Sequence, residues 1–288
     1  MTEPIRPSLL ALLVLAVLLA FAGNSVLTRA AIGGGHMGAM PFAALRLASG
    51  AFALALIVLW RDRQFTFGGP DRTAGVLSLA LYMVGFSMAY VALDSGVGAL
   101  ILFAGVQVVM FTGALIARET VPPARWIGAA LALAGLAWLL WPLGTTAPSL
   151  VHGALMGAAA LGWGVYSLIG RRTGDPLGTT AANFVLATPA VAAALWLLPP
   201  DPTPATWQGV ALAIASGVFA SGLGYALWYT VLPRLCAATA ALLQLTVPVL
   251  AALGGMAFLA EPLTARFAIA AALVLGGVTL GVLGARRR

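Results

Sequence analysis

Runs of apolar residues, each about as long as a membrane is thick, alternate along the chain with short breaks that contain Gly, Pro and Arg. A helix rises about 1.5 Å per residue, so ~20 apolar residues cross the ~30 Å hydrocarbon layer. The breaks are too short to fold as separate domains. We therefore predict ten transmembrane helices, at residues 8–28, 40–60, 72–93, 96–117, 124–142, 149–170, 177–198, 206–232, 236–259 and 265–285.

The composition makes the bilayer the expected partner of this chain. Of 288 residues, 61% are hydrophobic and 8% are charged, and the mean hydropathy is +1.02. Soluble domains carry roughly a quarter charged residues, so this inventory cannot cover a water-soluble surface. The net charge of +7 comes from arginines scattered between the spans, with no lysine, which argues against a nucleic-acid partner. The first span lacks an obvious cleavage site, so we interpret it as a retained helix and not a signal peptide.

The placement of the arginines predicts the orientation. With the N-terminus in the cytoplasm, the outer segments hold only Arg29 and Arg266, and the cytoplasmic segments hold most of the others. Such a bias marks the cytoplasmic side, so both termini are expected in the cytoplasm and the protein in the cytoplasmic (inner) membrane. The tryptophans near span ends are expected to be interfacial anchors: Trp60, Trp126 and Trp228 on the inner side, and Trp141, Trp196 and Trp207 on the outer side.

An internal repeat indicates duplication. The stretch from Gly98, GALILFAGVQVVMFTGALIARET, aligns without gaps to the stretch from Ala240, AALLQLTVPVLAALGGMAFLAEP. The alignment pairs Glu119 with Glu261, at the same helix ends. We predict two five-helix repeats, 1–145 and 146–288, that form one integrated transport domain. Because five is odd, the second copy enters the membrane from the opposite side, as in the inverted repeats of many secondary transporters.

Four short motifs, in this order, carry a family resemblance: FAGNSVLTR (21–29), ALRLASGAFAL (44–54), LGWGVYSLIGRR (161–172) and LTVPVLAALGGMAFLAEPL (245–263). With the ten-span layout, the chain resembles the drug/metabolite transporter superfamily, in its ten-helix branch with two EamA-type repeats. Two positions depart from the pattern: Phe21 stands where tryptophan is usual, and Val106 where the second repeat has Pro248. The resemblance implies a central cavity lined by helices 1 to 4 and 6 to 9, with helices 5 and 10 peripheral. Amino-acid and aromatic-metabolite exporters are the branch it favours first.

Polar and amphipathic residues inside the predicted spans are the candidate substrate-binding residues. Each needs a hydrogen-bond partner or a water-filled cavity at membrane depth. Interhelical hydrogen bonding is the alternative explanation for any one of them. As a group they favour a cavity, because several lie near mid-span on helices of both repeats. The candidates are Asn24, Tyr82, Gln107, Trp163, Tyr166 and Gln244, with Asn183 and Tyr225 as further polar groups within spans.

Arg46 is the one charge placed well inside a predicted span. Two explanations remain open. The side chain could snorkel toward the interface or bond backbone carbonyls, or it could pair with the carboxylate of a substrate. We include it among the substrate-binding residues. One cation suits one carboxylate, whereas sugar phosphates would need several cations, so neutral or zwitterionic metabolites are expected, aromatic or large apolar amino acids first.

The acidic residues and a proline carry two further expectations. The carboxylates lie at span ends, so the sequence does not support a buried proton relay, and Glu119 and Glu261 are expected to close the ends of helices 4 and 9. Pro248 removes a helical hydrogen bond in helix 9, and Gly254 and Gly255 follow it. These three residues are a candidate hinge, with a static kink as the alternative.

The competing functions are an intramembrane enzyme and a structural or assembly protein. Catalysis would need a nucleophile with a base, a carboxylate pair or metal ligands at membrane depth, and none is visible. His36 and His152 lie far apart with no Cys or Asp cluster beside them, and there is no nucleotide-binding P-loop. We therefore expect no catalytic residues, no metal and no cofactor, and a secondary transporter that exports small metabolites by alternating access.

Overall fold

The computed structural model describes residues 6–69, 71–116, 118, 122–141, 147–170, 173–197, 202–231, 234–235 and 243–284. Every regular element among them is a helix, which confirms the predicted all-α class of polytopic membrane protein. Glu119, Cys236 and the first part of the expected span 236–259 lie outside the described residues. The first five helices are α1 (Pro7–Ile32), α2 (Ala39–Asp62), α3 (Arg72–Ala89), α4 (Ser95–Ile116) and α5 (Pro123–Leu140).

The second half of the chain adds α6 (Leu150–Gly170) and α7 (Pro176–Leu197), then α8 (Trp207–Ala215), η1 (Ser216–Leu223) and α9 (Gly224–Val231), and finally α11 (Val247–Leu259) and α12 (Ala265–Gly284). The run α8–η1–α9 is continuous and makes one span, so the described residues form ten helical segments. Eight segments are long and apolar enough to cross a membrane, and α11 and α12 supply two shorter apolar stretches.

The eighth span differs from the regular helix that the sequence predicted. Its middle part, η1, has the wider turns of a π-helix. Such insertions are rare and occur often at functional sites. Glycine and serine make up four of the eight residues of SGVFASGL. These side chains are small enough for neighbouring helices to approach the widened backbone.

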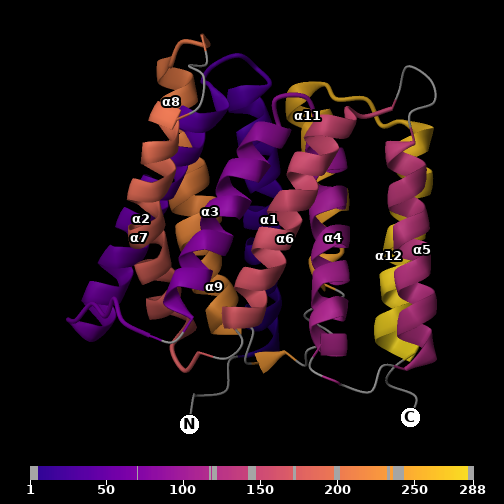
Figure 1. Ribbon diagram of the computed structural model, residues 1–288, viewed down its shortest axis with the longest axis horizontal. Helices are drawn as coiled ribbons and strands as arrows, with labels where there is room; N and C mark the ends of the chain where they lie inside the picture. Colours follow the sequence, from indigo (N-terminus) through magenta and orange to yellow (C-terminus); the bar gives the residue numbers. More distant parts are fainter. Residues whose placement is uncertain are drawn as a thin grey trace.

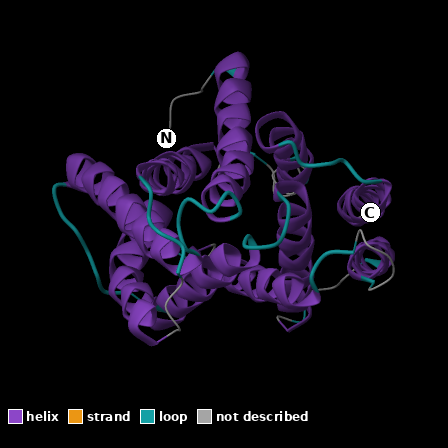
Figure 2. Ribbon diagram, turned by 90° about the horizontal axis from the view of Figure 1, so that it is seen from above, coloured by secondary structure: helices purple, strands orange, loops and turns teal. Residues whose placement is uncertain are grey.

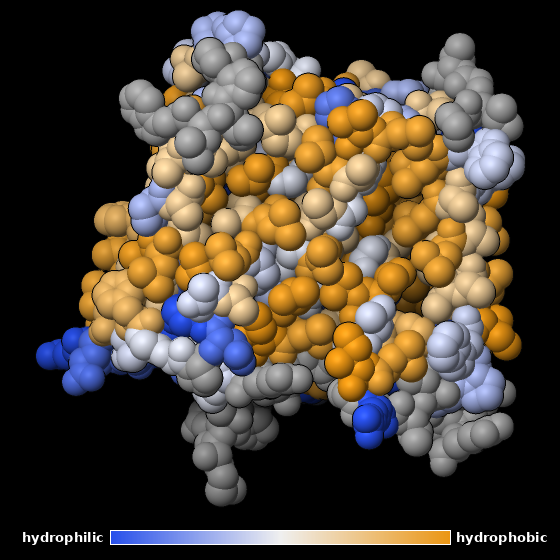
Figure 3. All heavy atoms as spheres, in the orientation of Figure 1, coloured by the Kyte–Doolittle hydropathy of each residue, from blue (hydrophilic) through white to orange (hydrophobic). Residues whose placement is uncertain are grey.

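The spans have two ends, called here the lower and the upper side after Figure 1, where α1 begins and α12 ends on the lower side. Apolar side chains cover most of the face between the two sides, and the most hydrophilic residues gather toward the lower edge (Figure 3). Such a surface matches a bilayer as the solvent.

Helices from the two halves of the chain pack against each other in a symmetric pattern. α2 packs on α7, α4 on α11 and α5 on α12, each pair being equivalent by the predicted repeat. α3 packs on α6, and in the matching way α1 packs on α8, η1 and α9. Exchanging the two halves maps these contacts onto one another, as expected for two inverted five-helix units. The predicted boundary after residue 145 falls in a stretch outside the described residues.

The α5–α12 pair stands beside the other helices in two views (Figures 1 and 2). Close packing holds the pair together: a Cβ atom at Gly277 would lie 2.6 Å from the Gly128 carbonyl oxygen, so the two backbones nearly touch. The peripheral position that the resemblance implied for helices 5 and 10 is thus what the structure has, and the remaining helices surround the protein's centre.

Four of the six tryptophans predicted as anchors at span ends are exposed. Trp60 and Trp207 are 87% and 76% exposed, and Trp126 and Trp141 are also exposed, as lipid-facing anchors should be. Trp228 is only 8% exposed, so its assignment as an anchor is wrong. The reason is that α9 packs along α1, which directs the Trp228 ring to Phe21 with 6.0 Å between the ring centroids. The side chain of Trp196 lies outside the described structure.

Candidate functional site

Arg46 lies in α2, and its side chain is fully buried. Its guanidinium donates hydrogen bonds from Nη2 to the Tyr82 hydroxyl of α3, at 3.0 Å, and from Nε to the Ser221 Oγ of η1, at 3.3 Å. It also faces the rings of Phe86 and Tyr82, with Cζ 4.8 and 5.4 Å from the ring centroids. The snorkelling alternative does not describe this side chain, because no part of it reaches the surface.

Asn24 of α1 extends the same network. Its amide nitrogen donates to the Tyr82 hydroxyl at 3.3 Å, and its carbonyl oxygen accepts a hydrogen bond from Ser216 Oγ at 2.7 Å. The Arg46 cluster, defined as Asn24, Arg46, Tyr82, Ser216 and Ser221, therefore joins α1, α2, α3 and η1. Its members lie seven to nine residues from the upper ends of their spans, except Ser221, which is further along. That spacing is about 10–14 Å of helix.

Arg46 and Tyr82 both have hydrogen-bond donors to spare. Arg46 Nη1 is buried and has no hydrogen-bond partner among the described residues. The Tyr82 hydroxyl accepts two hydrogen bonds, from Arg46 and from Asn24, so its own proton is left to donate. A buried donor without a partner is costly. This arrangement therefore points to a ligand or water that accepts hydrogen bonds.

A close contact between glycines of α2 and η1 fixes the position of Arg46. A Cβ atom at Gly217 would lie 3.0 Å from the Gly50 nitrogen and would clash with the Arg46 carbonyl oxygen. The backbones of α2 and η1 therefore touch, which carries Ser221 to the Arg46 guanidinium. Sequence analysis missed both serines. A signal was present, since two Ser–Gly pairs, Ser216–Gly217 and Ser221–Gly222, stand five residues apart in one span.

An aromatic layer adjoins the Arg46 cluster. The Trp163 ring of α6 lies 5.0 Å from the Tyr82 ring and 5.0 Å from the Tyr225 ring, measured between centroids. It also stacks on Tyr166 at 5.7 Å, while Phe184 packs edge-on against Tyr225 at 5.7 Å. These rings supply a large apolar surface next to a cation, which suits a flat or apolar molecule with one charged end.

Tyr166 belongs to a second polar cluster, toward the lower side. Its hydroxyl donates to Thr180 Oγ1 at 3.0 Å, and Thr180 donates to the Tyr229 hydroxyl at 3.2 Å. One turn along α7, Asn183 Oδ1 accepts a hydrogen bond from Arg72 Nη1 at 2.7 Å. The sequence-based set therefore divides: Asn24, Arg46 and Tyr82 are in direct contact, and Trp163 links them to Tyr166.

The other candidates do not join either cluster. Among the described residues, no hydrogen bond or ring contact connects Gln107 of α4 or Gln244 to the Arg46 cluster. Pro248 lies in the first turn of α11, where a missing backbone N–H leaves no broken helical bond. Gly254 lies against Val26 of α1, and the Gly255 carbonyl oxygen accepts from the Glu261 backbone nitrogen. The hinge made of these three residues stays a prediction.

Ionic contacts on the upper side, called here the upper closure, join the ends of α1 and α11 to the start of α4. Glu261 closes the end of its own helix with its backbone N–H, which donates to the Gly255 carbonyl oxygen. Its carboxylate also bonds a backbone group of another helix. It reaches across to the start of α4, where its two oxygens accept from the Ser95 backbone nitrogen at 3.0 and 2.9 Å. Arg29 Nε lies 3.5 Å from Glu261 Oε1, and Arg29 Nη2 lies 3.7 Å from Asp94 Oδ1. Burial raises the pKa of the Glu261 carboxyl, and the hydrogen bonds from Ser95 partly offset this. A recess of about 330 Å³ adjoins this closure, lined in part by Asp94, Pro148 and Phe267.

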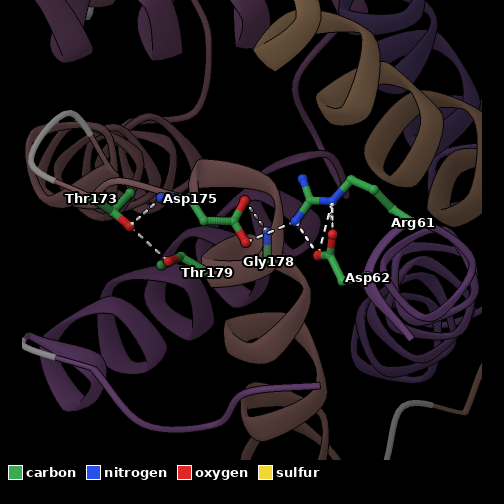
Figure 4. Close-up of polar contacts among 6 residues, drawn as sticks. All are labelled: Arg61, Asp62, Thr173, Asp175, Gly178 and Thr179. Atoms are coloured by element: carbon green, nitrogen blue, oxygen red, sulfur yellow. Dashed lines mark hydrogen bonds and ion pairs between the residues drawn. The ribbon is translucent and has the colours of Figure 1, made fainter. Parts of the chain in front are cut away.

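An exposed ion-pair group joins α2 to the start of α7 on the lower side. Arg61 lies between Asp62 and Asp175, and its Nη2 is 2.8 Å from Asp175 Oδ2 (Figure 4). Surface pairs of this kind contribute little to stability. Among the described residues, no three His, Cys, Asp or Glu side chains gather as a metal site would require.

Comparison with known proteins gives the family. The EamA-like transporter family model matches residues 153–283, which run from α6 into α12. An uncharacterized protein of Pseudomonas aeruginosa is 46% identical over 271 residues, 93% of each chain. The threonine/homoserine exporter RhtA of Escherichia coli is 31% identical over 246 residues, covering 79% of this chain and 76% of that one.

Two further matches agree. The aromatic amino acid exporter YddG of Ancylobacter novellus is 33% identical over 186 residues, 62% of this chain and 64% of that one. A crystal structure superposes with a TM-score of 0.66 at 23% identity over 95% of this chain and 99% of the other, which supports the fold alone. This multi-pass membrane protein therefore belongs to the EamA-like transporter family, within the drug/metabolite transporter superfamily.

Proposed function

We propose that the protein is a secondary transporter, and not an enzyme, that exports small carboxylate-bearing metabolites, with amino acids first. The observation that carries this proposal is the fully buried guanidinium of Arg46 with its unpartnered Nη1. A buried charge without a partner is unfavourable. A substrate carboxylate entering between α1, α2, α3 and η1 would supply the missing acceptor.

The aromatic layer supports an apolar or aromatic substrate body. A carboxylate held at Arg46 leaves the rest of a substrate facing Trp163, Tyr225 and Phe184, within ring contact of one another. The names of two relatives agree with this chemistry, since one is a threonine/homoserine exporter and the other an aromatic amino acid exporter. Sugar phosphates do not suit the site, because their additional charges would meet a single cation.

Alternating access would work by opening one side at a time. Glu261, Arg29 and Ser95 join α11, α1 and α4 on the upper side. We propose that this closure separates when the Arg46 cluster opens upward, and that α4 and α11 shift past each other in the same movement. Both termini are then cytoplasmic, and the upper side faces outward, as the arginine bias favours.

A transport assay in proteoliposomes tests the function. Radiolabelled phenylalanine, leucine and threonine should cross, unlabelled amino acids should compete, and glucose 6-phosphate should not. Strong competition by the sugar phosphate would refute the charge argument, and no transport of any amino acid would refute the proposed substrate class.

Cysteine labelling tests the orientation. In a variant with Cys236 replaced, single cysteines at Gly34 or Ala147 should react with an impermeant thiol reagent in intact cells. Cysteines at Asp62 or Thr173 should react only after lysis. The reverse pattern would invert the proposed orientation.

A further inference from the structure

The hydrogen-bond inventory around Arg46 distinguishes between two kinds of carboxylate substrate. An amino acid carries a carboxylate and an ammonium group, so it needs acceptors as well as donors. A 2-oxo acid, or another monocarboxylate, carries acceptor oxygens only. The two kinds can have the same apolar body and therefore the same contacts with the aromatic layer.

The oxygens of the Arg46 cluster all take part in hydrogen bonds within the cluster. The Tyr82 oxygen accepts from Arg46 and Asn24, the Ser221 oxygen accepts from Arg46, and the Asn24 carbonyl oxygen accepts from Ser216. Arg46 Nη1 is left without a partner, and the Tyr82 and Ser221 hydroxyl protons are left to donate. The lone pairs that remain, on the serine and Asn24 oxygens, belong to uncharged groups. The unpartnered charge of the site is thus complementary to a carboxylate, whereas an ammonium group would find only uncharged acceptors beside a cation.

The positions of the carboxylates also favour an anion at Arg46. The described carboxylates all lie at span ends, where Asp94 and Glu261 face Arg29, and Asp62 and Asp175 face Arg61. No described carboxylate pairs with Arg46. A monoanion would neutralise the buried guanidinium, whereas a zwitterion would bring a second cation into the same low-dielectric volume.

Two of the aromatic faces beside Arg46 are unsuited to an ammonium group. The rings nearest the cation, Tyr82 and Phe86, already face the guanidinium of Arg46. A ring that stabilises one cation is a poor site for a second cation beside it, because the two like charges repel each other.

We propose that the Arg46 cluster binds monocarboxylates that lack an ammonium group, such as aromatic and branched-chain 2-oxo acids, more tightly than the corresponding amino acids. The proposal rests on the proposed function, since it places the substrate carboxylate at Arg46. It adds a substrate class to the amino acids that the relatives' names suggest.

Matched ligands test this with the purified full-length protein. Phenylalanine, phenylpyruvate, 3-phenylpropionate and phenylalanine amide share one ring and differ at the charged end. Binding is measured by thermal shift and by competition for transport. We expect phenylpyruvate and 3-phenylpropionate to bind at least about tenfold more tightly than phenylalanine, and the amide to be without effect. Arg46→Gln should remove this ranking, while Arg72→Gln, a change at a guanidinium whose three nitrogens all have partners, should keep it.

A second variant tests the cause. Asn24→Asp is nearly isosteric and places an anionic acceptor in the cluster, so it should move the ratio of affinities toward phenylalanine by about tenfold. Tyr82→Phe removes a donor without adding charge and should weaken both carboxylates alike. Equal or tighter binding of phenylalanine by the wild-type protein would refute the inference and leave amino-acid transport standing. Binding of neither carboxylate would refute both, and competition by the amide would exclude Arg46 as the carboxylate partner.

Discussion

Arg46 and Arg72 are both arginines on neighbouring helices, yet their surroundings differ in kind. Arg72, at the start of α3, is partly exposed and donates to the carbonyl oxygens of Phe67, Gly68 and Thr179 and to Asn183 Oδ1, at 2.7 to 2.9 Å. Each of its three guanidinium nitrogens has a partner. Arg46 is fully buried, bonds two hydroxyl groups and keeps Nη1 without a partner.

The two arginines differ in what their hydrogen bonds serve. Arg72 ties the loop before α3 to α7, so its hydrogen bonds serve the fold. Arg46 is held among weak neutral acceptors at a depth where an unpaired charge is costly. If Arg46 serves binding, as proposed, and Arg72 serves the fold, the two roles predict opposite effects of the same substitution.

The largest expected effect is from Arg46→Gln, compared with Arg72→Gln. Loss of a charge-assisted contact to the substrate should lower kcat/KM for transport by about tenfold to 100-fold. The same change removes an unpaired buried charge, so the melting temperature should stay constant or rise. Arg72→Gln should lower the melting temperature and leave KM within about twofold. Purified variants measured in proteoliposomes and by thermal unfolding decide between the roles, and a destabilised Arg46→Gln with normal transport would make the two arginines alike.

Two glycines give the next largest effect, one beside each arginine. Gly217→Ala places a methyl group against the backbone of α2 at Arg46 and should cost about 1–3 kcal/mol of unfolding free energy. At Gly75 the methyl group would meet the side-chain amide of Asn183, which can move, so Gly75→Ala should cost less. The control is Gly157→Ala: Gly157 has open space around it and should gain about 0.5–1 kcal/mol. Equal losses of unfolding free energy in Gly217→Ala and Gly75→Ala would show that the contact between α2 and η1 is no more rigid than the contact of Gly75 with Asn183.

Trp163→Ala should have a smaller effect, about threefold to tenfold on transport of aromatic substrates, because the ring contributes packing and not charge. Trp207, 76% exposed at the start of α8, is the matched control, and Trp207→Ala should leave transport unchanged. Substrates with small side chains should lose less than aromatic ones in Trp163→Ala. Equal losses at the two tryptophans would remove the argument for an aromatic-lined site.

The smallest expected effect is on the pH dependence of the melting temperature, from Glu261→Gln on the upper side. The folded-state pKa of Glu261 is raised, so the folded protein holds that proton more tightly than the unfolded chain does. Its stabilising contribution is present at low pH and is lost as the pH rises through the folded-state pKa. Glu261→Gln should therefore reduce the fall in melting temperature with rising pH by about 1–3 °C.

Asp175→Asn is the matched variant on the lower side. It removes an exposed ion pair with Arg61, so its effect should shrink as salt is added. If the change in melting temperature caused by Glu261→Gln depends on salt and not on pH, Glu261 acts as a surface ion pair in the same way as Asp175.

The sequence is enough to predict the ten spans, their approximate ends and the membrane as solvent. These properties are local, because the length and apolar character of a run decide whether it crosses a bilayer. Arg46 and the nearby polar residues were also visible, since each is rare at membrane depth. The family resemblance followed from motifs on the same spans.

Which of these residues contact one another depends on the tertiary structure. Asn24 and Tyr82 are 58 positions apart, and Arg46 and Ser221 are 175 apart. In spans that are apolar on every side, the sequence period does not say which face turns toward which neighbour. The rotation of each helix is set by close contacts, such as Gly217 against the Arg46 carbonyl oxygen, and by the wide turns of η1. For this reason the sequence did not predict that Trp228 is buried or that the polar residues form two clusters. Nor did it predict that Arg46 Nη1 lacks a hydrogen-bond partner.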